Sequence, residues 1–96
     1  MNMNITFPRT ELRDHVSDPV EFLVDVDGKR VRAEIDLSTL AALNPAGHAG
    51  AGAMRDFVMQ KLGHIERTIE AHILARGIPP NRVIVIDLAE LRARLA

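Results

Sequence analysis

The feature that most constrains this fold is a pair of alternating segments in residues 20–37 that meet at Asp27-Gly28. Asp-Gly is a two-residue turn signal, because both positions tolerate a positive φ. When the chain folds at this turn, one face of the hairpin is apolar and the other is almost entirely charged. An antiparallel pair with one covered face requires this pattern, since side chains alternate with a period of two. The predicted pairs are Val24–Val31, Phe22–Ala33 and Val20–Ile35 on the apolar face, and Asp25–Arg30, Leu23–Arg32 and Glu21–Glu34 on the other.

Length and composition indicate one small domain without a strong electrostatic attraction to any partner. The 96 residues suit a single domain over 1–96 and are too few for two full cores. A net charge of −1 gives no field that would attract nucleic acid, an anionic membrane or an acidic substrate. The chain has no cysteine, which excludes disulfides, thiolate catalysis and cysteine-based metal sites.

Neither a secretion signal nor a membrane span is expected. Residues 1–10 lack the basic region and long apolar run of a signal peptide. No window approaches the ~18 consecutive apolar residues that a spanning helix needs. The sequence therefore predicts a cytoplasmic location and no membrane partner.

The apolar period changes along the chain and predicts the remaining elements. A strand is expected at 4–7, a short helix at about 39–43, and one long helix at about 53–76. Gly77 and Pro79-Pro80 end the long helix. Its apolar residues recur at helical spacing on one arc, which comprises Met54, Val58, Leu62, Ile65, Ile69 and Ile73.

Residues 83–86 are apolar at four successive positions, which is typical of a strand that is covered on both faces. Asp87 and Glu90 have the spacing of a helix cap, so a terminal helix follows. This helix is the favoured cover for the second face, because Leu88, Leu91 and Leu95 lie at helical spacing. Three leucines do not make a full second layer, however. We therefore expect a homodimer whose interface includes the strand Val83–Ile86 or the helix 88–96.

Together these elements predict an α+β fold. An antiparallel β-sheet of three to four strands, with the hairpin 20–36 at its centre, packs on the long α-helix at about 53–76. A short C-terminal helix completes the domain.

The four histidines do not predict a metal site. His15 and His48 fall in predicted loops, whereas His64 and His72 fall on the long helix, eight residues apart. That spacing separates them by about 12 Å along the helix axis, which is too far to share one ion. His72 lies on the apolar arc, so we expect a histidine at the edge of the core that is bonded through its ring nitrogens.

Catalytic and cofactor motifs are equally weak, and no catalytic, cofactor-binding or metal residue is predicted. Ser17 precedes a predicted turn at Asp18-Pro19, Ser38 resembles a helix cap, and neither serine has the setting of a nucleophile elbow. Glu66 and Glu70 are expected on a solvated helix edge. The glycine-rich segment 46–52 precedes a helix, but it lacks the Gly-Lys-Ser/Thr ending of a phosphate-binding loop and is interpreted as a flexible connector.

Basic residues gather at two places without forming a clear nucleic-acid surface. Arg30 and Arg32 share the outer hairpin face, where Glu21, Asp25, Glu34 and Asp36 oppose them, and Arg92 and Arg94 lie near the end of the chain. A groove-binding surface normally has an excess of basic residues. Nucleic-acid binding is therefore not the expected function, and it stays an alternative because two-stranded ribbons can enter a major groove.

The order of these motifs resembles a small bacterial family, the domain-of-unknown-function family fourteen-eighty-eight. The matching residues are Pro19-Val20-Glu21-Phe22 with Val26-Asp27-Gly28, then Ile35 to Leu43, then the helix from Met54 to Arg76. The resemblance implies a fold of this kind and an association with regulation. It implies no catalytic residues.

Three functional hypotheses follow. The leading one is a non-enzymatic interaction or regulatory domain. The second is a small-molecule-binding protein or small enzyme, with a pocket between the loop 46–52 and the long helix that uses His48 and His72. The third is a nucleic-acid-binding regulator.

Overall fold

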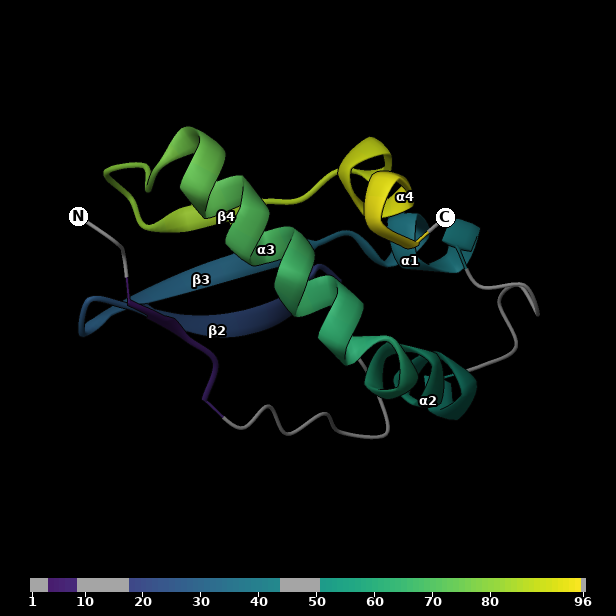
Figure 1. Ribbon diagram of the computed structural model, residues 1–96. Coiled ribbons are helices and arrows are strands. Elements are labelled where there is room, and N and C mark those ends of the chain that lie inside the picture. The colour runs from purple at the N-terminus through teal and green to yellow at the C-terminus, as the bar shows by residue number, and fades with distance from the viewer. Residues whose placement is uncertain (1–3, 9–17, 44–50, 96) are drawn as a thin grey trace.

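The computed structural model describes residues 4–8, 18–43 and 51–95, without the side chains of 51–54 and 94–95. The described residues form a four-stranded sheet and four helices, which confirms the α+β prediction (Figure 1). Along the chain the elements are β1 (Ile5–Thr6), β2 (Val20–Val26), β3 (Lys29–Ile35), α1 (Leu37–Leu43), α2 (Ala51–Gln60), α3 (Leu62–Arg76), β4 (Val83–Val85) and α4 (Leu88–Leu95).

The hairpin of β2 and β3 has the predicted register at every pair. Val24 lies opposite Val31, and Leu23 lies opposite Arg32. The turn uses positive φ at both central residues, 53° at Asp27 and 83° at Gly28, as an Asp-Gly turn requires. Burial alternates along both strands, so the apolar face of the hairpin is in the core.

The fourth strand corrects the prediction that the sheet is antiparallel throughout. The strand order is β1-β2-β3-β4, and β4 pairs parallel to β3, with Ile84 next to Ala33. The reason is the long connection between them. Helix α3 returns the chain across the sheet, so β4 starts at the same end as β3, and a crossover of this kind joins parallel strands.

The predicted long helix is broken into α2 and α3 at Lys61, whose φ and ψ of −101° and 9° are not helical. A straight helix over 53–76 would be about 35 Å long, whereas a seven-residue strand such as β2 spans about 23 Å. The break lets both parts bury apolar side chains, Phe57 and Val58 from α2 and Ile65 from α3. The end of α3 is as predicted, because Gly77 has a φ of 76° and its N–H donates to the Ile73 carbonyl at 2.8 Å.

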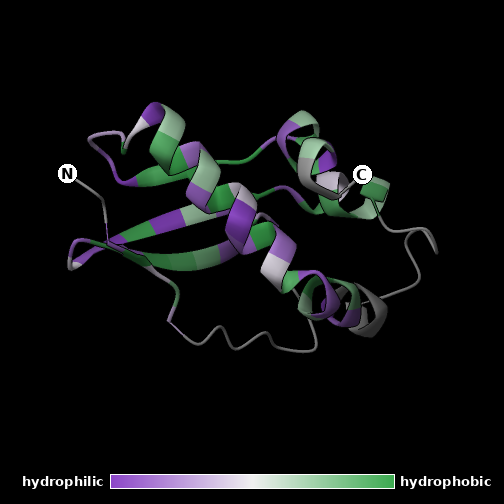
Figure 2. Ribbon diagram, viewed as in Figure 1, coloured by the Kyte–Doolittle hydropathy of each residue, from purple (hydrophilic) through white to green (hydrophobic). Residues whose placement is uncertain are grey.

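The core lies between α3 and one face of the sheet, while α1, α2 and α4 gather at one end of it (Figure 1). Figure 2 shows hydrophilic and hydrophobic residues alternating along β3. The buried apolar residues are Val20, Phe22, Val24, Val26, Val31, Ala33, Ile35, Leu40, Phe57, Val58, Ile65, Ile69, Ile73, Ile84, Ile86 and Leu91.

The terminal helix does not cover the second face of the last strand, which corrects that prediction. Helix α4 packs on α3 and α1, and its Leu91 is fully buried there. Its start is as predicted, because the Glu90 N–H donates to Asp87 Oδ1 at 2.8 Å. With α4 placed at the end of the sheet, Val85 on β4 keeps 58% of its surface exposed.

Candidate functional site

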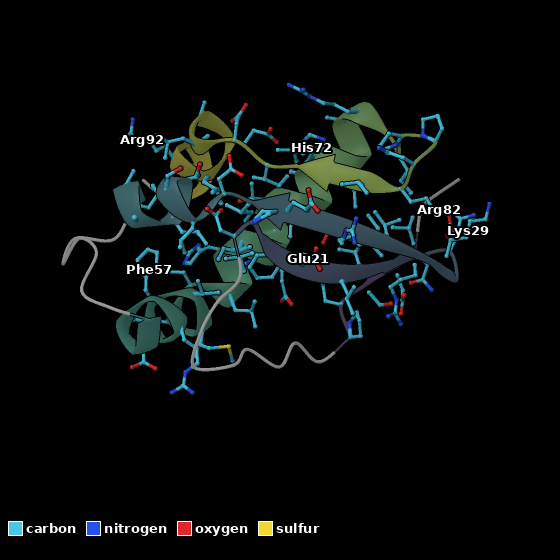
Figure 3. All side chains as sticks on the ribbon, turned by 180° about the vertical axis from the view of Figure 1, so that it is seen from behind. Glu21, Lys29, Phe57, His72, Arg82 and Arg92 are labelled. Carbon is cyan, nitrogen blue, oxygen red and sulfur yellow. The ribbon has the colours of Figure 1, made fainter. Side chains whose placement is uncertain are left out.

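The face of the sheet turned away from α3 is the first candidate surface, and we call it the outer face. Figure 3 views the molecule from this side, and no helix of the described residues lies over it. By strand register it carries Glu21, Leu23 and Asp25 from β2, Arg30, Arg32 and Glu34 from β3, and Val83 and Val85 from β4.

The charged residues of the outer face are paired with each other. Arg30 Nε lies 2.6 Å from Asp25 Oδ1. Arg32 lies 3.6 Å from Glu21 Oε1 and 3.4 Å from Glu34 Oε2. Both arginines thus face carboxylates of their own sheet, and a phosphate backbone would have to displace these partners. This arrangement gives the nucleic-acid hypothesis no support.

Apolar side chains interrupt the charges on the outer face. Val85 is 58% exposed and Leu23 is 41% exposed, whereas Val83 is half-buried. Leu23, Arg32 and Val83 are neighbours in one row across β2, β3 and β4. Because the aliphatic stem of an arginine is itself apolar, this row offers continuous hydrocarbon contact below the guanidinium group.

The free edge of β4 is less suited to a partner than the outer face. The strand has only three residues, and short edge strands are one way in which proteins avoid pairing with other chains. In addition, the Val83 N–H already donates to Asn81 Oδ1 at 3.1 Å. A partner that uses this region would therefore contact the outer face rather than extend the sheet.

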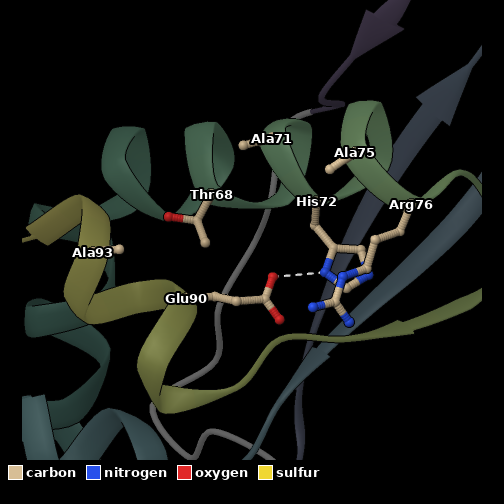
Figure 4. A pocket seen from close by; sticks show the side chains of 7 residues that line it. All are labelled: Thr68, Ala71, His72, Ala75, Arg76, Glu90 and Ala93. Carbon is tan, nitrogen blue, oxygen red and sulfur yellow. Dashed lines mark hydrogen bonds and ion pairs between the residues drawn. The ribbon is translucent and has the colours of Figure 1, made fainter.

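The second candidate site is a hollow of about 280 Å³ between α3 and α4 (Figure 4). Its polar side chains converge from both helices, and its other walls are mostly alanine. The lining residues are Thr68, Ala71, His72, Ala75, Arg76, Glu90 and Ala93.

His72 and Glu90 meet in this hollow. His72 Nδ1 lies 2.6 Å from Glu90 Oε2, and the two side chains are only 11% and 22% exposed. This confirms the prediction that His72 lies at the edge of the core with a bonded ring nitrogen. No local pattern pointed to this partner, because Glu90 is 18 residues away on another helix.

The pair has the geometry of a base and the carboxylate that orients it, but the described residues supply no nucleophile beside it. The hydroxyl of Thr68, which lines the same hollow, donates to the His64 carbonyl at 2.9 Å. Ser38 is on α1, away from the hollow. The arrangement can bind and orient a ligand, and within the described part of the chain it does not form a catalytic triad.

The other residues considered in the sequence fall in different places. His15, Ser17, His48 and residues 46–50 lie outside the described residues, so the predicted pocket beside 46–52 is not tested there. Ala51 and Gly52, assigned to the connector, instead begin α2. No group of three potential metal ligands occurs among the described residues.

Glu66 corrects one prediction about the helix surface. Glu70 is exposed as expected, whereas Glu66 is partly buried. Desolvation by this burial raises the pKa of the Glu66 carboxyl above 4.5. The shift arises from partial burial of one carboxyl, and Glu66 does not line the hollow.

Comparison with known proteins adds no assignment. No family model matches the chain, and searches of curated proteins and of solved structures find no similar protein. The resemblance to family fourteen-eighty-eight therefore stays a prediction from the residues quoted above. Within the described residues, no helix is long and apolar enough to cross a membrane.

Proposed function

We propose that this protein is a non-enzymatic interaction domain that binds a second copy of itself through the outer face. The observation that carries the proposal is the exposure of Val85 and Leu23 on a complete sheet whose outer face no described helix covers. Contiguous apolar patches are a mark of protein contact surfaces, and Leu23 and Val83 share one row across the sheet with Val85 on the same face. The absence of cysteine suits a reducing compartment, and the cytoplasm stays the expected location.

The charge pattern of the outer face favours a second copy as the partner. Glu21 and Asp25 make β2 acidic on this face, and Arg30 and Arg32 make the adjacent β3 mainly basic. Consider two copies whose outer faces meet. A two-fold axis that runs parallel to the strands, midway between β2 and β3 and between the two sheets, would place β2 of each copy over β3 of the other. Asp25 of each copy would then lie over Arg30 of the other and add to the pair that Arg30 already makes in its own sheet, whereas Glu21 would lie over Glu34, a like-charge contact that weakens the dimer.

The size of the outer face indicates how tight such a dimer would be. Strands β2 and β3 have seven residues each and β4 has three, so together they cover at most about 23 Å by about 14 Å, or a projected area on the order of 300 Å². Stable complexes bury about 800 Å² on each partner. We therefore expect a weak dimer that forms only at high protein concentration.

Helix α4, the alternative interface, exposes less apolar surface on its described side chains. Its Leu91 is buried inside the domain, and its exposed side chains include Ala89, Arg92 and Ala93. These residues provide little apolar area, because two of the three end at Cβ. The proposal therefore assigns the interface to the strands.

Two matched variants test the proposal by sedimentation velocity over a concentration series. Val85→Lys places a charge in the outer face, and Leu74→Lys places the same charge on α3, where Leu74 is 60% exposed. The wild type and Leu74→Lys should rise in mass from 10.6 kDa toward twice that value, while Val85→Lys should remain monomeric. A wild type that is monomeric throughout, or equal loss in both variants, would overturn the proposal.

A further inference from the structure

The guanidinium group of Arg76 lies at the hollow between α3 and α4 without an acidic partner. No carboxylate of the described residues is within ion-pair distance of it, and the nearby carboxylate of Glu90 is bound to His72 instead. Figure 4 shows His72 and Arg76 leaving α3 on the same side, with Glu90 approaching from α4. An arginine in this position has planar donors available for a carboxylate.

His72 supplies a second polar contact in a fixed orientation. Glu90 holds the Nδ1 side of the ring at 2.6 Å, so the Nε2 side is left for another partner. When the ring is doubly protonated, Nε2 is a donor, and the adjacent Glu90 balances the charge of the ring. An oxyanion between Nε2 and the Arg76 guanidinium would then accept hydrogen bonds from both.

The remaining walls select for an apolar body. Ala71 and Ala75 on α3 and Ala93 on α4 end at Cβ, which leaves about 280 Å³ between the helices. This volume lies just below the usual range of about 300–1,000 Å³ for ligand pockets, so only a small ligand would fit. Polar groups on one side and methyl groups on the others match a compact molecule with a single charged end.

We infer that the hollow binds a small monocarboxylic acid with a compact apolar body, its carboxylate on Arg76 and His72 and its body against the alanines. The inference does not rest on the proposed dimer, because the hollow is lined by residues of α3 and α4 and shares none with the outer face. Failure of one proposal would leave the other intact.

Benzoate is the probe, with binding followed through backbone amide NMR shifts of α3 and α4. Benzamide keeps the ring without the charge, and acetate keeps the charge without the ring. Benzoate should give saturable shifts around His72 and Ala75 and bind more tightly than either control compound. No saturation with benzoate, or equal affinity for benzamide or acetate, would overturn the inference.

Variants then distinguish binding of benzoate in the hollow from non-specific attraction of benzoate to basic residues. Arg76→Gln should weaken benzoate binding at least about tenfold, which corresponds to about 1.4 kcal/mol. Arg67→Gln removes an exposed arginine of the same helix that does not line the hollow, and it should bind as the wild type does. Ala75→Leu fills the hollow at an exposed position and should abolish binding while thermal unfolding stays cooperative. Equal effects of the two arginine variants, or unchanged binding by folded Ala75→Leu, would contradict the assignment.

Discussion

At the scale of single residues, the contact between His72 and Glu90 is the main polar link between α3 and α4 in the described structure. The sequence placed His72 at the edge of the core, because its position on the apolar arc is a local property. It could not identify Glu90 as the partner. That contact depends on where α4 packs, and the spacing of Glu90 from Asp87 indicated only a helix start.

A double-mutant cycle with His72→Gln and Glu90→Gln measures this link. A largely enclosed hydrogen bond to a charged group contributes about 1.5–3 kcal/mol, so we expect a coupling energy of that order in the free energy of unfolding. Urea denaturation of the four proteins gives the coupling. Glu90→Gln also removes a charge near the start of α4. This effect is the same with and without the His72→Gln change, so it cancels in the cycle. Additivity within about 0.5 kcal/mol would show that the contact does not stabilise the fold.

Glu66 predicts a specific pH dependence. Burial raises the pKa of this carboxyl in the folded state above its unfolded value, so folding favours the protonated form. Its contribution to stability is therefore fully present below pH 4.5 and is lost as pH rises through the folded pKa. Glu66→Gln should raise the unfolding temperature at pH 7 and have little effect at pH 3. Glu70→Gln, an exposed change on the same helix, is the control, and an equal gain there would contradict this explanation.

At the scale of elements, local patterns were sufficient for the hairpin and insufficient for the connections. The register of β2 and β3 follows from one turn and a period of two, and both lie within a short segment. The break at Lys61 was missed because the apolar arc continues through it from Val58 to Ile65. The direction of β4 was missed because it depends on the path of α3 across the sheet, which no local pattern contains.

Shortening a buried side chain should lower the free energy of unfolding most on helix α3. Ile65 is fully buried between this helix and the sheet, so Ile65→Ala removes packed atoms and leaves a cavity. We expect a loss of about 2–5 kcal/mol in the free energy of unfolding, a large share for a domain of this size. Leu74→Ala on the exposed side of the same helix should cost less than about 0.5 kcal/mol. Urea titration of both variants checks this, and similar losses would contradict the assigned packing.

At the scale of the whole molecule, the described helices lie on one side of the sheet or at its end, and none of them covers the outer face. The sequence predicted both the apolar excess of residues 83–86 and its two possible covers. The cover it favoured, α4, packs elsewhere, because the leucines of α4 have helical spacing whichever surface they contact, and a second copy of the chain stays a proposal. In the structure Leu91 is buried against α1 and α3, which leaves Val85 exposed.

Methyl NMR over a dilution series tests the proposed use of the outer face most directly. If two copies meet there, the methyl signals of Leu23, Val83 and Val85 should shift with concentration and fit a single dissociation constant. The methyl signals of Leu74, which is equally exposed on α3, should stay fixed over the same series. Unchanged signals at Val85 up to the highest concentration, or shifts of the same size at Leu74, would contradict the proposed interface.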